Sequence, residues 1–415
     1  MDSAVSRRHG PDAGMATLGG ALRGRDNAFG FVRLVLASLV IVDHAFPLGG
    51  YGEDPMWGWT KSQESFGGLA VGGFFVASGF LITKSAMSSD AIQFLWRRCL
   101  RIFPAFWAVL LVSVFLVSPL FYVRDHGNLN GYWTPDLPGP WTYLTRNWTL
   151  DIGQYGLLDV FGQTPYARQV GWSVLNGSLW TLAYEWKCYI IVGALALFGV
   201  LRLGKVVVPA LAAGLTVLAA AATSSPQFGS SLAPWLGDPH FVQLGALFLW
   251  GSVVAVYADR VPSTGRLALL ACLVLIISLF VKGGYHLVGY PALAYLVLWV
   301  AGNAPVRLRR INARNDYSYG IYVYGFLVQM ALADLGVHRL GLVPYICVSW
   351  LVTFGCAYLS WHLVEKRALR LKDRGPGRGL GYWLARLRRT GPSVPVDGSP
   401  DVEVSDARER VASHG

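Results

Sequence analysis

The first long apolar stretch of the chain, Phe29 to Leu48, contains an arginine and a histidine, Arg33 and His44. A charged or titratable side chain inside a bilayer costs about 2.5–3.5 kcal/mol on insertion scales, so such residues usually face a cavity and carry function. Eleven residues of α-helix turn about 1100°, which leaves the two side chains ~20° apart around the helix and ~16 Å apart along it. One helix face therefore presents a guanidinium and an imidazole, the side chain best suited to move a proton near neutral pH. The alternative is a snorkelling arginine and a packed histidine.

Apolar segments of about 20 residues, each long enough to span a membrane, recur along nearly the whole chain. The composition agrees, because 53% of the residues are hydrophobic and only 14% are charged. We predict an all-α integral membrane protein with about ten transmembrane helices. The predicted spans are 29–48, 66–84, 101–123, 177–200, 205–223, 240–258, 266–282, 285–302, 315–333 and 343–365.

The distribution of basic residues gives the predicted orientation. With a cytoplasmic N-terminus, the inner segments hold 27 of the 35 Lys and Arg residues and the outer segments hold six. This asymmetry follows the positive-inside rule, and it predicts an even number of spans with both termini cytoplasmic, in the cytoplasmic membrane. The net charge of +11 is then explained by residues that flank membrane spans, so we expect no nucleic-acid partner.

We divide the chain into a polar N-terminal segment (1–28), a membrane-embedded domain (29–372) and a C-terminal tail (373–415). The tail has too little apolar surface to fold alone, and it either lies along an anionic membrane surface or is simply solvated. The outer segment from Arg124 to Asn176 contains four tryptophans among polar residues, which fits a carbohydrate acceptor or membrane-interface anchoring equally well. The cysteines and histidines have no disulfide or metal-ligand spacing, so no metal is expected.

Two clusters are candidates for binding a ligand. Arg97, Arg98 and Arg101 share a helix face, and guanidinium groups bind phosphate oxygens in bidentate fashion. The alternative is that they only anchor the topology. The second span is rich in small residues, including Ser78 and Gly79, which let helices pack closely or let a ligand pass along the backbone.

The fourth predicted span carries an acidic residue, Glu185, ~13 Å from its outer end. An intramembrane carboxylate needs a partner, and Arg33 and His44 are the candidates. Lys187 points ~200° away from Glu185 on a helix, so we expect it to make another contact. Asp43 points ~100° away from His44, which makes it a poorer orienting partner.

Six motifs in this order resemble those of the acyltransferase 3 family of membrane O-acyltransferases, over about residues 26–372. They are Arg33-x10-His44, Phe74-Phe75-Val-x-Ser78-Gly79-Phe80, the Arg97–Arg101 cluster with Ile102-x-Pro104, Ser178-Leu179-Trp180-x4-Glu185, Ser318-Tyr319-Gly-Ile-Tyr322 and Val364-Glu365-Lys366.

The resemblance implies ten core helices, a cytoplasmic acyl-CoA donor and an acceptor hydroxyl reached from the outer side. The roles that it implies are catalytic base for His44, motif partner for Arg33, active-site carboxylate for Glu185, and donor binding for Arg97, Arg98, Arg101, Ser78 and Gly79. This chain has Tyr324-Gly325 where many members have Trp-His, and Arg367 where many have proline. We therefore expect no second histidine after the Ser-Tyr motif.

The sequence thus predicts transfer of an acyl group, most simply acetyl, from acyl-CoA to a hydroxyl of a glycan, a lipid-linked saccharide or a glycosylated metabolite. Direct transfer and an acyl-histidine intermediate are both compatible with the residues. The alternative is a multi-pass transporter or exporter of an anionic or glycosylated substrate, with Arg33, Glu185 and Lys187 as binding charges.

Overall fold

The computed structural model describes residues 16–24, 26–88, 90–198, 204–225, 227–228 and 239–374. These residues form helices and connecting segments, with no strand among them and one isolated bridge between Thr17 and Pro262. Most of the predicted N-terminal segment (1–15) and nearly all of the predicted tail (375–415) lie outside the described residues.

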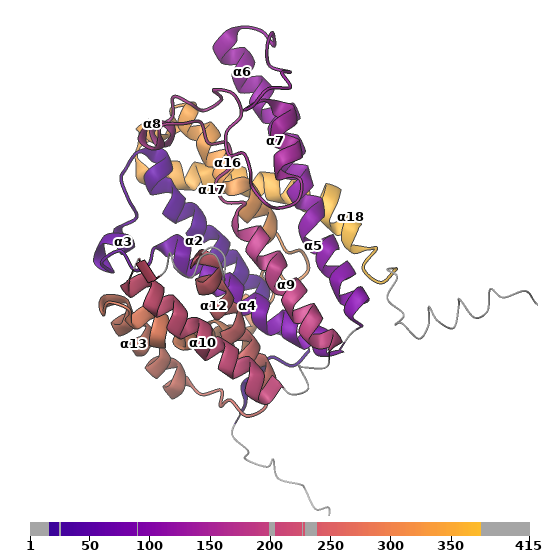
Figure 1. Ribbon diagram of the computed structural model, residues 1–415, viewed down its shortest axis with the longest axis vertical. Coiled ribbons are helices and arrows are strands. Elements are labelled where there is room, and N and C mark those ends of the chain that lie inside the picture. The colour runs from indigo at the N-terminus through magenta and orange to yellow at the C-terminus, as the bar shows by residue number, and fades with distance from the viewer. Residues whose placement is uncertain are drawn as a thin grey trace, which may run out of the picture. The chain divides into compact units, whose positions relative to one another are not determined.

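Long helical segments occupy the positions of the ten predicted spans (Figure 1). They are α2 (Phe29–Gly49), α4 (Phe66–Ser88), α5 with η1 and α6 (Ala91–Val112, Ser113–Val117, Ser118–His126), α9 (Thr181–Leu197), α10 (Gly204–Ser224), α12 (Pro239–Tyr257), α13 (Gly265–Phe280), η3 with α14 (Tyr285–Gly289, Tyr290–Asn303), α16 (Ser318–Asp334), and α17 with η5 and α18 (Leu342–Ser360, Trp361–Glu365, Lys366–Leu369).

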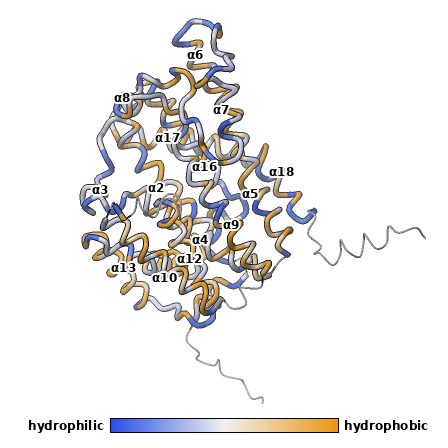
Figure 2. Tube along the Cα trace, in the orientation of Figure 1, coloured by the Kyte–Doolittle hydropathy of each residue, from blue (hydrophilic) through white to orange (hydrophobic). Residues whose placement is uncertain are grey.

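Seven of these segments, within the described ranges, are long and apolar enough to cross a membrane. The other three are shorter: α9 and α16 have 17 residues each, and α13 has 16. Figure 2 shows hydrophobic residues along most of α10, α12 and α13, and hydrophilic residues around α6. The prediction of an all-helical membrane protein is confirmed, whereas the count of ten spans and the cytoplasmic termini stay predictions.

The glycine-rich α4 packs against α2, α9, α12 and α14. Its crossing with α12 is especially close: a Cβ on Gly79 would lie 1.9 Å from the carbonyl oxygen of Phe248, and one on Gly251 would lie 2.1 Å from that of Val76. Only glycine permits this approach. The close packing holds α2, α9 and α12 around α4, and three of these four helices carry Arg33, His44, Ser78 and Glu185.

The segment between α6 and α9 is folded, with helices and buried side chains of its own, and is not an open loop. It contains α7 (Pro140–Asn147) and α8 (Pro165–Val170), and buries Tyr132, Tyr143 and Phe161. Asn147 exchanges hydrogen bonds with the backbone of Gln154, at 2.8 and 3.0 Å. Short helices α1 (Leu18–Ala21), α3 (Pro55–Trp59), α15 (Val306–Arg309) and η4 (Val337–Leu340) complete the described elements.

Candidate active site

Three adjoining cavities run between the helices. The arginine cavity, of about 50 Å³, is lined by Arg33, Arg98 and Arg101 among others. It shares Arg33, Glu185 and Tyr319 with a constriction of about 30 Å³. The constriction in turn shares Val71, Thr181 and Tyr322 with the His44 cavity, of about 370 Å³. Polar groups that are far apart in the sequence therefore lie along one internal path.

Two arginines of the arginine cavity, Arg33 and Arg101, belong to an ion-pair cluster. Asp316, in the turn before α16, accepts hydrogen bonds from both Arg33 and Arg101 at 2.5 Å. Burial alone would raise the pKa of Asp316, but the charges of the two arginines outweigh it and lower the pKa to about 2. Arg101 also lies 3.6 Å from Glu365 of η5, and the Tyr319 hydroxyl donates to the Ile102 carbonyl at 2.8 Å.

Residues from four of the six motifs thus meet in this cluster. They are Arg33, Arg101, Tyr319 and Glu365. Sequence reasoning did not identify Asp316, although a carboxylate two residues before the Ser318-Tyr319 motif and near the end of an apolar span is a usable signal. The Val-Glu-Lys motif supplies the second carboxylate beside Arg101 through Glu365.

Glu185 has other partners than those expected from the sequence. Its Oε1 accepts hydrogen bonds from the Ser78 hydroxyl at 2.8 Å and from the Tyr189 hydroxyl at 2.5 Å. The prediction that Arg33 or His44 pairs with Glu185 is wrong, because Arg33 turns to Asp316 and His44 opens into the next cavity. Arg33 and Glu185 nevertheless line the same two small cavities.

The predicted donor residues separate into two groups. Ser78, Arg98 and Arg101 line the arginine cavity, whereas Arg97 forms a 3.0 Å ion pair with Asp373. Within the described residues Arg98 makes no ion pair, and its guanidinium lies 6.0 Å from the centre of the Phe94 ring.

The assignment of Gly79 to donor binding stays a prediction, and its position shows a role in packing. Gly79 faces the backbone of α12, where any side chain would collide with the Phe248 carbonyl, so its role is close helix packing. Lys187 behaves as expected, since its Nζ lies over the rings of Tyr184 and Phe241, at 5.2 and 5.9 Å, and not beside Glu185.

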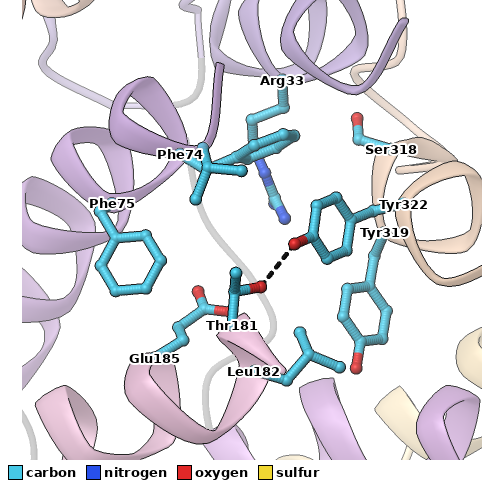
Figure 3. Close-up of a pocket in the computed structure, with 10 residues that line it drawn as sticks. Arg33, Phe74, Phe75, Thr181, Leu182, Glu185, Ser318, Tyr319 and Tyr322 are labelled. Carbon is cyan, nitrogen blue, oxygen red and sulfur yellow. Dashed lines mark hydrogen bonds between the residues drawn. The ribbon is translucent and has the colours of Figure 1, made fainter. Parts of the chain in front are cut away.

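The constriction is closed by side chains from α4, α9 and α16. Figure 3 shows Phe74 and Phe75 on one side, Glu185 and Leu182 on another, and a hydrogen bond between Thr181 and Tyr322. The two hydroxyl oxygens lie 2.5 Å apart, and the Tyr322 hydroxyl also donates to the Ser178 carbonyl at 3.0 Å. These bonds tie the start of α9 to the N-terminal part of α16.

His44 lies near the C-terminal end of α2, with its ring centre 5.3 Å from that of Phe326 in an edge-to-face arrangement. Its cavity is also lined by polar residues that sequence reasoning missed, among them Glu64, His240, Gln243 and His286. Glu64 lies in the turn before α4, where burial raises its pKa to about 7. The run Ser62-Gln63-Glu64-Ser65, directly before an apolar span, was the available signal.

Asp43 lines the His44 cavity as well, and it lies beside Asp54, the N-cap residue of α3. Burial and a hydrogen bond to Asp43 raise the pKa of Asp54 to about 6. Among the described residues, no group of three or more His, Cys, Asp or Glu side chains is arranged to hold a metal ion.

The helices and the enclosed polar path define a polytopic membrane protein with an internal site that is charged at one end and carries a histidine at the other. The chain belongs to the acyltransferase 3 family, whose model, described as an acyltransferase domain, matches residues 26–362. This confirms the resemblance inferred from the six motifs, and the protein is an acyltransferase.

Two relatives align over most of the chain. It is 29% identical to an O-acetyl transferase of Shigella phage Sf6 over 355 residues, which cover 83% of this chain and 96% of the relative. It is also 29% identical to nodulation protein 10 of Rhizobium leguminosarum bv. viciae over 380 residues, 86% of this chain and 97% of the relative. No solved structure matches the chain.

Proposed function

We propose that this protein transfers an acyl group, most simply acetyl, from acyl-CoA to a hydroxyl of a glycan, a lipid-linked saccharide or a glycosylated small molecule. The observation that carries the proposal is the row of cavities, each sharing wall residues with the next, from Arg98 and Arg101 to His44. Similarity to an O-acetyl transferase supports transfer to oxygen. The match over 26–362 supports treating 29–372 as one acyltransferase domain.

The arginine end is the proposed donor entrance. Arg98 is the first candidate for the phosphates of acyl-CoA, since Arg101 is already shared between Asp316 and Glu365. A cavity of about 50 Å³ is too small for a nucleotide, because pockets for such ligands measure about 300–1,000 Å³. The nucleotide therefore stays at the mouth and only the pantetheine arm enters. The basic residues at this end support a cytoplasmic entrance in the cytoplasmic membrane.

The chemistry is assigned to the His44 cavity. Neutral His44 takes the proton of the acceptor hydroxyl while the hydroxyl oxygen bonds to the thioester carbonyl carbon. The C–S bond then breaks, and the CoA thiolate takes a proton from the His44 imidazolium. General-base catalysis of this kind contributes about 10²–10⁴-fold. In the covalent alternative His44 is itself acylated before the acceptor attacks.

The remaining site residues have supporting roles in this proposal. Arg33 lies ~16 Å along α2 from His44, so it belongs to the donor end. Glu185 holds the hydroxyls of Ser78 and Tyr189 there. The hydroxyls of Thr181 and Tyr322 lie at the boundary with the His44 cavity, where they can stabilise the developing oxyanion once the constriction opens.

The test is transfer of label from radiolabelled acetyl-CoA by the protein in nanodiscs, supplied with envelope extract of the source organism. Wild type should label a glycan or lipid fraction, and H44A and H44Q should lose at least 100-fold of the rate while remaining folded. The matched control is H362A, since His362 lies in η5 and lines none of the three cavities. Full transfer by H44A would reject the histidine base, and glycan counterflow without acyl-CoA would favour a transporter instead.

A further inference from the structure

The His44 cavity has an unbalanced charge. Among the described residues that line it, the carboxyl groups are Asp43 and Glu64, and none is a lysine or an arginine. A ligand with a carboxylate or a phosphate would bring a negative charge into a site whose lining offers no lysine or arginine to pair with it. The cavity therefore disfavours anionic sugar units.

Polar side chains line the same cavity, among them Gln63, Gln243 and His286. His286 is only 2% exposed, its Nε2 lies 3.3 Å from the Thr223 hydroxyl, and its Nδ1 has no hydrogen-bond partner in the described part of the chain. Oδ1 of Asp43 also has no hydrogen-bond partner among the described residues. Sugar hydroxyls, which both donate and accept hydrogen bonds, can pair with the polar side chains that line this cavity.

The cavity continues into a wider aromatic groove of about 650 Å³, with which it shares Trp180 and His240. The rings of these two residues meet at 5.3 Å. The groove's aromatic lining consists of Tyr155, Tyr166, Trp172, Trp180 and Tyr184. Trp172 is 63% exposed, so most of its ring is open to a ligand.

A pyranose ring suits such a groove, because its C–H faces stack on aromatic rings while its hydroxyls point to polar edges. The charged residues in the groove are Asp151 and Lys187, and the Lys187 ammonium already lies over aromatic rings. The groove therefore offers ring faces beside a cavity that offers hydrogen bonds.

We propose that the acceptor is a saccharide of at least two units. The unit that is acylated carries no carboxylate or phosphate and occupies the His44 cavity, and the next unit stacks in the aromatic groove on Trp172 and Trp180. This inference rests on the proposed function, since it assumes that the acceptor hydroxyl reaches His44.

The test uses oligosaccharides from acid-hydrolysed envelope glycan, separated by anion exchange into neutral and acidic fractions and by size into mono-, di- and trisaccharides. Each fraction is offered to the protein in nanodiscs with radiolabelled acetyl-CoA. Neutral di- and trisaccharides should be labelled at least tenfold faster than monosaccharides and acidic fragments. Equal labelling of acidic fragments, or of monosaccharides, would overturn the proposal.

A tryptophan variant separates the groove from a general effect on folding. W172A should raise the KM for the neutral trisaccharide at least fivefold and leave the KM for the monosaccharide unchanged. The matched control is W59A, because Trp59 is also 63% exposed but lies in α3, outside the groove lining. A KM change that is equal for both sugars, or a similar change in W59A, would count against the groove.

A second readout covers the case in which no fraction is labelled. The fractions are tagged at the reducing end with an uncharged fluorophore, and their binding to the protein without acyl-CoA is followed by anisotropy. Preferential, Trp172-dependent binding of neutral di- and trisaccharides would support the groove while rejecting acyl transfer. Binding with no preference for charge or length would reject the groove itself.

Discussion

Replacing Asp316 by asparagine tests whether the ion-pair cluster holds the donor end of the site together. The carboxylate accepts two 2.5 Å bonds from Arg33 and Arg101, and its side chain is only 21% exposed. Its pKa falls from 3.8 to about 2, and 1.36 kcal/mol per unit makes this about 2–3 kcal/mol of stabilisation. D316N also leaves two largely buried guanidiniums without their shared carboxylate, for which the usual loss is about 3–5 kcal/mol.

Thermal unfolding in detergent, followed by tryptophan fluorescence, measures the loss. The unfolding entropy is about 2.1 cal/mol/K per residue, so for 415 residues a loss of 1 kcal/mol in the free energy of unfolding lowers Tm by about 1 °C. D316N should therefore lower Tm by about 3–5 °C. The control is D373N, which also removes a carboxylate from an arginine pair, 3.0 Å from Arg97. Because Asp373 is 64% exposed, D373N should change Tm by less than about 1 °C.

The pH dependence of this stabilisation has a definite sign. A carboxyl whose pKa is lowered on folding contributes stability above its unfolded pKa of 3.8, and the contribution is lost as the pH falls through about 2. The Tm difference between wild type and D316N should therefore be constant between pH 5 and 8. Equal Tm values for D316N and D373N, or a difference that vanishes within this range, would refute the reasoning.

Three further variants test other parts of the structure. R98Q should raise the KM for acyl-CoA at least tenfold, because a charge-assisted hydrogen bond contributes about 1.5–3 kcal/mol. In the same initial-rate assay, the control R97Q should change this KM less than twofold. G79A should cost about 1–3 kcal/mol in thermal unfolding, because its Cβ collides with the backbone of α12, whereas G355A, with no atom within 4 Å, should not destabilise. Because the pKa of Glu64 is raised in the folded protein, the free energy of unfolding falls as the pH rises towards about 7. E64Q should therefore reduce the fall in Tm between pH 5 and 7, and an unchanged slope of Tm against pH would contradict this.

The fold class was predictable because membrane spans are encoded locally. An apolar run of sufficient length identifies a span without any knowledge of its neighbours, and α2, α4 and α12 lie where their runs predict. The shorter α9, α13 and α16 have ends that also depend on what surrounds them. The 17 residues of α16, for example, begin after the Asp316 turn, whose contacts come from α2 and α5.

The site was predictable only where its geometry lies within one helix. The helical spacing of Arg33 and His44 correctly indicated that both face internal cavities, ~16 Å apart along α2. The partner of Glu185 was not predictable in this way, because pairing between helices depends on how the helices are placed around α4. Ser78 was singled out as a small residue, but its hydrogen bond to Glu185 appears only once α4 and α9 are packed together.

The separation of Arg33 from His44 has a chemical consequence for the proposed reaction. Donor and acceptor must approach from different cavities and meet at the constriction, where Phe74 and Phe75 face the hydrogen-bonded pair Thr181 and Tyr322 (Figure 3). The constriction, of about 30 Å³ and lined by these rings, has room for little water, so a thioester that waits on its donor side is protected from water until an acceptor fills the His44 cavity and the constriction opens. In the proposed reaction, the charged groups bind the donor at one end, the histidine accepts the proton at the other, and the narrow aromatic segment between them keeps the acyl group from water.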